Sequence, residues 1–152
     1  FKGIDSNSSA KFLGIQYLIY SNSKFLNFEN NTPVSFKEAV DIHHFYPSNY
    51  LAKEYGKDSD EYDVSDTILN KVFINKIANI KYKDNKPSKY LKDLKNNTDI
   101  SKALTSHLIP SPKDTISGKN DKLFMKFIQE RYKLIESYLE VLSKDLDKLK
   151  TK

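Results

Sequence analysis

The sequence predicts an α+β domain that is mostly helical, with a small strand hairpin at its centre and a long C-terminal helix. Apolar residues recur at helical spacing in several short segments, and most regularly over residues 121–149. Two runs rich in β-branched residues, around 40–44 and 68–74, have the composition of strands. A chain of 152 residues with 38% hydrophobic residues suits one domain around one core.

We therefore expect residues 1–152 to form a single domain, with a site-bearing core at 10–119 and a packing helix at 120–150. The chain opens on Phe1 without an initiator Met, so we expect a fragment of a longer protein. No apolar run is long enough to span a bilayer, so no membrane partner is expected. Cysteine is absent, which excludes disulfides and thiolate metal sites and fits a cytoplasmic location.

The first half of the chain alternates short helices with polar breaks. Residues 11–20 are apolar enough for a packed helix, with Ser8 or Ser9 as its N-cap. Residues 21–35 are polar and contain a turn at 30–33, because Asn and Pro favour turns. Residues 35–38 have the Ser-x-x-Glu form of a capping box, so they either open one helical turn or form a loop. A strand follows at 40–44, and Pro47 ends it.

The second half is expected to be helical apart from one strand. We expect a helix at 48–55 that ends at Gly56, a loop at 57–65, the strand at 68–74 and a helix at 75–84. Pro87 starts the next helix at 88–94, followed by a helix at 100–109 and a loop at 110–118. Residues 121–149, with Asn120 as N-cap, have apolar residues at spacings of three, four and seven. Packing against the core is the favoured use of this helix, ahead of a coiled coil in its C-terminal third.

Lysines dominate the charge of the chain. The net charge is +5, which is compatible with a polyanionic partner, and residues 70–95 hold eight lysines against two aspartates. Such a run usually marks a solvated helical face, with contact to phosphates as the second interpretation. The candidates for phosphate contact are Lys71, Lys76, Lys81, Lys83 and Lys86. Arginine is nearly absent, which argues against sequence-specific contacts to guanine.

Two of the chain's three histidines, His43 and His44, are adjacent at the end of the first expected strand. Neighbouring residues on a strand face opposite sides, but at a strand end they can converge on one site. One imidazole could then hold a metal ion while the other moves a proton. Taken alone, an adjacent pair is more often without function, and His107 is more simply a structural residue that bonds backbone near Pro110.

The order of several short motifs resembles the HNH (His-Me finger, ββα-metal) nucleases. In that family a strand ends in an acidic residue or His, then His, two residues and Pro; a second strand carries an Asn, and a helix supplies a metal ligand nine residues later. Here His43-His44-Phe45-Tyr46-Pro47 is followed by Asn70 and by Asn79. Asp66 and the break at 85–87 match further features of the HNH module of the RNA-guided CRISPR nuclease.

A closer resemblance is to the C-terminal HNH domain of GmrSD-like restriction proteins, and it covers roughly residues 10–145. It is carried by the histidine motif together with Ile68-Leu69-Asn70-Lys71, Pro87-Ser88-Lys89-Tyr90-Leu91 and Ser106-His107-Leu108-Ile109-Pro110. The pair Phe45-Tyr46 departs from the usual apolar-Phe pair. The resemblance implies a ββα-metal hairpin and helix that form the core of a metal-dependent DNA endonuclease in a restriction or anti-phage protein.

The resemblance also implies a role for each site residue. His44 would be the general base and Asn70 would fix its ring, while His43 and Asn79 would hold one divalent cation. Mg²⁺ or Mn²⁺ suits these ligands best, and imidazole also accepts Zn²⁺ or Ni²⁺. The expected products carry 5′-phosphate and 3′-hydroxyl ends. Asp41 and Asp66 are expected to be solvated carboxylates at strand edges rather than metal ligands.

The expected partners are DNA and an upstream sensor or nucleotide-binding domain of the same protein, and double-strand cleavage by paired nicking would need a homodimer. Two other functions remain open from the sequence. The domain could be an HNH-derived nucleic-acid-binding module without catalytic activity. It could also be a helical interaction domain in which the histidines are incidental.

Overall fold

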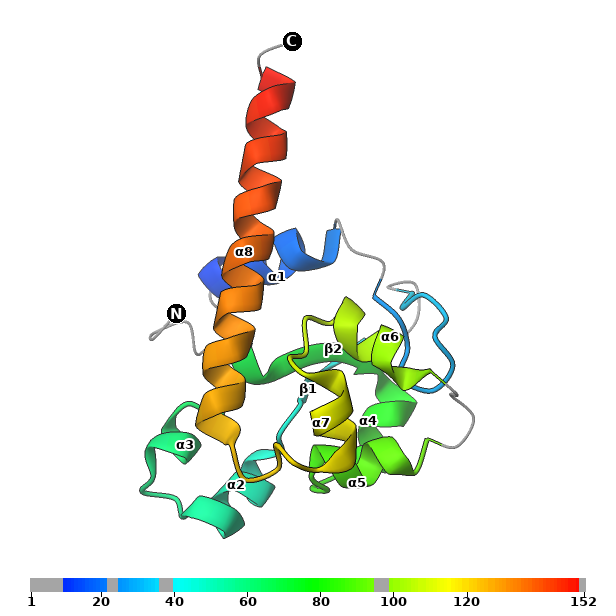
Figure 1. Cartoon of the computed structure of the whole chain (residues 1–152), viewed down its shortest axis with the longest axis vertical. Coiled ribbons are helices and arrows are strands. Elements are labelled where there is room, and N and C mark those ends of the chain that lie inside the picture. Colours follow the sequence, from blue (N-terminus) through cyan, green and yellow to red (C-terminus); the bar gives the residue numbers. More distant parts are fainter. Residues whose placement is uncertain (1–9, 22–24, 36–39, 95–98, 151–152) are drawn as a thin grey trace.

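Helices surround one small antiparallel hairpin in the computed structural model, which describes residues 10–21, 25–35, 40–94 and 99–150 (Figure 1). The strands are β1 (Val40–His44) and β2 (Lys71–Asn75), with a 3-10 turn, η1 (Ile68–Asn70), before β2. The helices are α1 (Ala10–Ser21), α2 (Ser48–Tyr55), α3 (Asp60–Asp63), α4 (Lys76–Tyr82), α5 (Pro87–Lys92), α6 (Ile100–Ser106), α7 (Pro112–Ser117) and α8 (Phe124–Lys150). This architecture confirms the predicted α+β, mostly helical fold with a long C-terminal helix.

The hairpin and the helix that follows it form one continuous unit. β1 and β2 are antiparallel, with Val40 opposite Asn75 and His44 opposite Lys71. Asn75 ends β2 and caps α4, because its side-chain oxygen accepts a hydrogen bond from the Ile77 N–H at 2.8 Å. α4 therefore follows β2 without a connecting loop, at the end of the sheet where Asn75 pairs with Val40.

Most predicted elements are confirmed, and the differences have local causes. The loops predicted at 57–65 and 110–118 each contain a short helix, α3 and α7. The Ser59 side chain caps α3 by accepting from the Tyr62 N–H, and α7 starts at Pro112 and ends at Gly118, whose φ is 87°. The second strand starts at Lys71 rather than at Ile68, because η1 precedes it. The expectations for Ser8, Ser9 and 36–38 lie outside the described residues.

An aromatic core lies between the hairpin and α8. Phe45 and Tyr46, which follow directly after β1, are both fully buried. The Phe45 ring stacks on Phe127 of α8 with a centroid distance of 5.4 Å, and Tyr46 contacts Phe124 and Phe127 edge-on. Phe45 and Tyr46 therefore anchor the end of β1 to the long helix.

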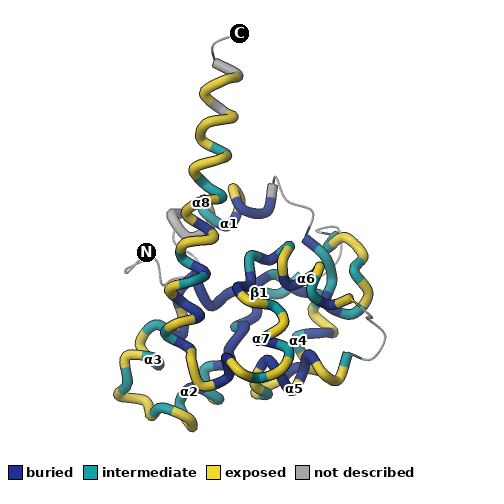
Figure 2. The backbone as a smooth tube through the Cα atoms, viewed as in Figure 1, coloured by how far each residue is buried: buried dark blue, intermediate teal, exposed yellow. Residues whose placement is uncertain are grey.

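The long helix α8 has two different halves (Figure 2). Its first half packs on the core, and Phe124, Phe127 and Ile135 are buried there. Its second half extends away from the rest of the fold, and Val141 is exposed. The predicted packing role is thus correct for the first half. Within the part of the chain that is described, no helix is both long enough and apolar enough to cross a membrane.

Arg131 joins α8 to the hairpin. Its guanidinium is buried and donates to the carbonyls of Leu69 and Lys71, both at 2.8 Å, and to the His107 carbonyl at 3.3 Å. Burial lowers the pKa of Arg131 to about 10, so the group stays protonated at neutral pH. Arg131 therefore fixes the start of β2 against the long helix.

Candidate functional site

The two histidines at the end of β1 open onto one shallow pocket. The pocket has a volume of about 240 Å³, and both His43 and His44 line it together with Asn79 of α4 and Lys83 just after α4. His44 is the last residue of the strand and pairs with Lys71 of β2. The convergence predicted for a strand end is therefore present.

His43 and Asn79 are in direct contact. The His43 Nδ1 atom lies 2.7 Å from the Asn79 side-chain oxygen, although the residues are 36 positions apart. The amide nitrogen of Asn79 donates to an Asp41 carboxylate oxygen at 3.2 Å. Because a carboxylate only accepts, Asp41 sets the orientation of the amide and turns its oxygen toward His43. Asp41, predicted to be a solvated carboxylate, is instead a partner of this site.

The surroundings of His43 are dry. The residue is 4% exposed, and its ring lies against Tyr82 and Tyr90 with centroid distances of 5.6 and 5.8 Å. Burial lowers the pKa of His43 to about 4; the Asn79 hydrogen bond opposes this shift, and the neighbouring His44 adds to it. His43 is therefore neutral at pH 7, as a metal ligand must be.

The contact between His43 and Asn79 fits one divalent cation. Neighbouring ligands around a cation with bonds of ~2.1 Å lie roughly 3 Å apart, so the 2.7 Å contact would have to open only slightly. The buried Nε2 atom of His43 has no hydrogen-bond partner among the described residues. A cation on Nδ1 would move the ring proton to Nε2.

The other donors near the site are few. Within the described ranges, no group of three or more His, Asp or Glu side chains is placed to hold a metal ion. The candidate ligands are one imidazole and one amide oxygen. Oxygen ligands suit Mg²⁺ and Mn²⁺, and imidazole also suits Zn²⁺ and Ni²⁺.

His44 is in wetter surroundings than His43. Its side chain is 32% exposed, and its Nε2 atom lies 2.7 Å from a carboxylate oxygen of Asp66. The same oxygen lies 2.8 Å from the Lys71 ammonium. Partial burial raises the pKa of Asp66, but the hydrogen bonds from Lys71 and His44 outweigh it, so the net pKa is lowered. Asp66 is thus ionised at neutral pH; its side chain is 59% exposed, as expected of a solvated carboxylate, and it also bonds His44 and Lys71.

The side chain of Asn70 hydrogen-bonds backbone groups and not the ring of His44, which differs from its predicted role. Its amide nitrogen donates to the carbonyls of Tyr46 and Ser65, both at 2.8 Å, and its side-chain oxygen accepts from the Tyr46 N–H at 2.9 Å. Both amide protons are therefore already used. Its backbone carbonyl also accepts from the Phe45 N–H. Asn70 fixes the backbone directly after His44, so any effect on the base is indirect.

The five candidate lysines have different surroundings. Lys71 is buried against Asp66, so its predicted phosphate contact is wrong. The Lys86 ammonium is 2.8 Å from a carboxylate oxygen of Asp121 and is about half exposed. Lys76 and Lys81 are exposed, but Lys81 lines other pockets. Lys83 lines the histidine pocket, and its φ of 47° is unusual for a residue other than glycine.

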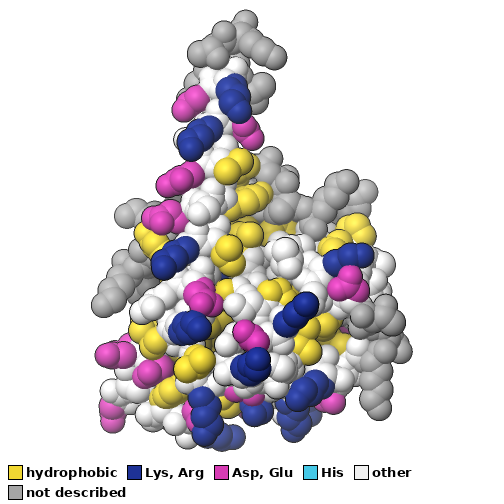
Figure 3. Space-filling view, viewed as in Figure 1, with side chains coloured by type: hydrophobic (Ala, Val, Ile, Leu, Met, Phe, Trp, Pro, Cys, Tyr) yellow, Lys and Arg dark blue, Asp and Glu magenta, His cyan; other side chains and the backbone are white. Residues whose placement is uncertain are grey.

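Charge is unevenly distributed over the visible face (Figure 3). Basic and acidic side chains alternate along the projecting part of α8, whereas basic side chains gather along the lower edge of the view. A mixed surface of this kind favours local phosphate contacts over one broad basic patch.

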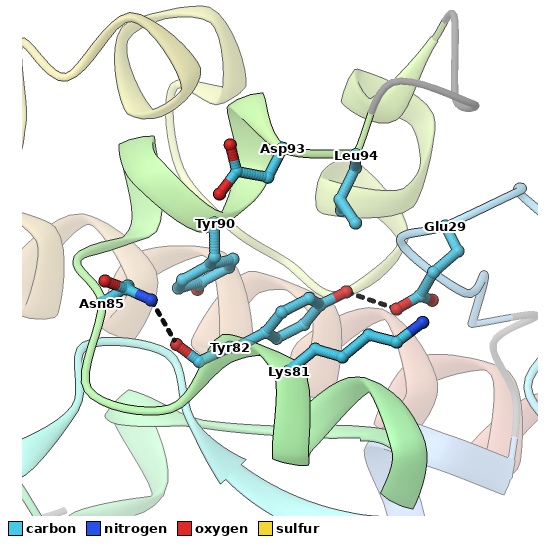
Figure 4. Close-up of a pocket in the computed structure, with 7 residues that line it drawn as sticks. All are labelled: Glu29, Lys81, Tyr82, Asn85, Tyr90, Asp93 and Leu94. Atoms are coloured by element: carbon cyan, nitrogen blue, oxygen red, sulfur yellow. Dashed lines mark hydrogen bonds between the residues drawn. The ribbon is translucent and has the colours of Figure 1, made fainter.

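A larger pocket of about 390 Å³ lies elsewhere (Figure 4). Tyr82 and Tyr90 form part of its wall; the Tyr82 hydroxyl donates to Glu29 at 2.5 Å, and Asn85 donates to the Tyr82 carbonyl. It shares no lining residue with the histidine pocket. We place the site at the smaller pocket, because that pocket holds the convergent imidazoles and the amide oxygen.

His107 is structural, as predicted, although its partner differs. It is buried, its Nε2 atom lies 3.0 Å from the Leu26 carbonyl, and its ring contacts Phe25 and Phe28. Burial lowers its pKa to about 3, so the ring is neutral.

Comparison with known proteins adds no relative. No family model, no curated protein and no solved structure matches the chain.

Proposed function

We propose that this chain is a metal-dependent endonuclease domain of the HNH type that hydrolyses phosphodiester bonds in DNA. The main support is geometric. The end of β1 and the helix α4 bring His43, His44 and Asn79 to one pocket, with the His43 and Asn79 donor atoms 2.7 Å apart. This arrangement agrees with the strand, strand and helix layout that the sequence resemblance implies.

His44 is the general base in this proposal. Its Nε2 atom is bonded to Asp66, which leaves Nδ1 to take a proton from the attacking water. The water oxygen bonds to phosphorus as the P–O3′ bond breaks, and the 3′ oxygen takes a proton from solvent. Lys83 contacts a phosphate oxygen. A divalent cation, when bound by His43 and Asn79, would neutralise charge on the phosphate and on the departing 3′ oxygen.

The proposal extends to the biological setting. The chain has few arginines for base contacts, so we expect the domain to bind mainly the DNA backbone. An upstream sensor or nucleotide-binding domain would then supply specificity, in a cytoplasmic restriction or anti-phage protein. A homodimer would be needed for cleavage of both strands.

Supercoiled plasmid provides the test. Incubation with Mg²⁺ or Mn²⁺ should give nicked or linear product with 5′-phosphate and 3′-hydroxyl ends, and EDTA should stop the reaction. The His44→Ala variant should be inactive while keeping its melting temperature. Activity that survives in His44→Ala, or ends of the opposite polarity, would refute the assignment of the base.

A binding module without cleavage is the second candidate, and one observation favours it. His43 is 4% exposed and its Nδ1 atom already bonds Asn79, so access for a cation is narrow. Bound Mn²⁺ at 100 times its Kd should stabilise the fold by ~2.7 kcal/mol, and His43→Ala or Asn79→Ala should remove that effect. Plasmid retardation with neither cleavage nor Mn²⁺ stabilisation would support the binding module. If the plasmid is not retarded at all, the remaining candidate is a helical interaction domain that does not bind DNA.

A further inference from the structure

Asp66 connects two groups that belong to different parts of the hairpin. One of its carboxylate oxygens lies 2.7 Å from the His44 Nε2 atom and 2.8 Å from the Lys71 Nζ atom. His44 and Lys71 are themselves opposite each other in the register of β1 and β2. A single oxygen therefore bridges the end of one strand and the start of the other.

The bond to Asp66 determines which ring nitrogen of His44 carries the proton. An ionised carboxylate can only accept a hydrogen bond, so the neutral ring must carry its proton on Nε2. Nδ1 is then the unprotonated nitrogen. Without this bond, the two tautomers of a half-exposed histidine would interconvert freely, and only one would present a free nitrogen at Nδ1.

Lys71 holds Asp66 in place. The side chain of Lys71 is fully buried, whereas that of Asp66 is 59% exposed. A buried ammonium requires an anionic partner, and Lys71 lies on a strand that Arg131 anchors through the Lys71 carbonyl. The position of the Asp66 carboxylate is thus set by a rigid strand, although Asp66 itself lies in a loop.

We propose that Asp66 is a positioning residue that fixes the ring of His44 with its proton on Nε2, and that buried Lys71 fixes Asp66. This inference rests on the proposed nuclease function for its catalytic meaning. Its structural part, the tautomer of His44, stands apart from any activity.

The tautomer is measured by long-range ¹H–¹⁵N NMR of the histidine rings in the metal-free protein. The wild type should show one His44 tautomer, protonated on Nε2, and so should the control Asp63→Asn, which changes an exposed aspartate three residues away. Asp66→Ala should show a mixture, and Asp66→Asn should restore much of the Nε2–H form because its amide oxygen can accept. A mixture of His44 tautomers in the wild type, or a single Nε2–H tautomer in Asp66→Ala, would overturn the proposal.

Kinetics and stability separate positioning from a structural effect. Asp66→Ala should lower kcat by about 10- to 100-fold with little change in KM. It should also lower the melting temperature, because it removes the carboxylate that pairs with the buried Lys71 ammonium. The double variant Asp66→Ala/Lys71→Met removes both charges, so its melting temperature should recover while kcat stays low. Recovery of kcat together with stability would show that Asp66 is only structural.

If the wild type cuts no DNA, the proposed function fails while the NMR result still decides the tautomer. If the wild type cuts and Asp66→Ala keeps both its tautomer and its kcat, only the positioning role fails. The two proposals are therefore tested independently.

Discussion

The two histidines at the end of β1 occupy opposite surroundings although they are consecutive in the sequence. His43 is 4% exposed, lies against two tyrosines and bonds an uncharged amide. His44 has a side chain that is 32% exposed and bonds an ionised carboxylate. The comparison shows that the chemistry of a histidine is set by its partners and its hydration, because the side chains are identical.

The difference arises from one step along a strand end. His43 follows the normal alternation and faces Asn79 and Asp41 on the α4 side of the hairpin. His44 is the last strand residue and meets the loop that carries Asp66. We call the surroundings of His43, Asn79 and Asp41 the dry side of the site, and those of His44 and Asp66 the wet side. A ligand role requires a neutral ring on the dry side, and a base requires access to water on the wet side.

Replacing His44, the proposed general base, should have the largest effect. We expect His44→Ala to lower kcat by about 1,000-fold, because general-base catalysis contributes 100- to 10,000-fold. Plasmid nicking rates measure this loss, and added imidazole should restore part of the rate. A variant that keeps more than a tenth of the wild-type rate would contradict the comparison.

Replacing Asn70 should destabilise the backbone that follows directly after the two histidines. The Asn70→Ala variant leaves two buried carbonyls and one N–H without partners, and we expect a loss of ~3 kcal/mol in the free energy of unfolding. Urea unfolding measures the change. The matched control is Asn49→Ala, an exposed asparagine with one bond to Asp84, which should cost less than about 0.5 kcal/mol. Equal effects of the two variants would refute the role of Asn70.

Lowering the pH should destabilise the fold through His43, on the dry side of the site. The folded pKa of His43 is about 4 and the unfolded value is near 6.5, so the unfolded chain binds more protons between these values. The contribution of neutral His43 to the free energy of unfolding is therefore complete above pH 6.5. It is lost as the pH falls toward 4, at about 1.4 kcal/mol per pH unit. His107, whose folded pKa is about 3, adds a similar slope to the dependence of the free energy of unfolding on pH.

Urea unfolding in EDTA at several pH values between 5 and 7 tests this expectation. His43→Gln should reduce the slope of the free energy of unfolding against pH by about one proton's contribution, and His107→Gln should do the same. An unchanged slope in His43→Gln would show that the ring is more hydrated than its burial indicates.

The smallest expected effect concerns phosphate contact at the rim of the site. Lys83→Ala should weaken DNA binding a few-fold and reduce the salt dependence of the affinity by about one unit of slope. Lys133→Ala, an exposed lysine on α8, serves as the control and should change neither. A fluorescence titration at several salt concentrations measures both variants, and identical slopes would remove Lys83 from the site.

The sequence predicted the elements of the fold better than the contacts between them. Helical periodicity and the strand runs predicted every long element, but Asn120, the expected N-cap of the last helix, lies before the start of α8 at Phe124. The family resemblance, through the nine-residue spacing of Asn70 and Asn79, pointed to Asn79, which lies beside His43. The helices and strands are local, so the order of residues along the chain is sufficient to predict them, whereas the His43–Asn79 contact was expected only from the resemblance.

The contacts that the sequence did not predict depend on the path of loops. A lysine-rich run does not reveal that Lys71 lies under the carboxylate of Asp66, nor that Asn70 has no free amide proton. The burial of Arg131 could have been predicted from the sequence, because Arg131 stands at helical spacing with Phe124, Ile128 and Ile135 on the buried face of α8. A charged residue at such a position predicts a specific buried partner.

The hydrogen bonds of Arg131 also bear on when the site can form during protein synthesis. The carbonyls that it binds belong to Leu69 and Lys71, which are made 62 and 60 residues earlier. At 5–20 residues per second the ribosome needs roughly 3 to 12 s to cover that interval. Until then the hairpin lacks the clamp at the start of β2. Chains that stop before Arg131 would therefore lack the hydrogen bonds that fix the start of β2 beside the proposed site.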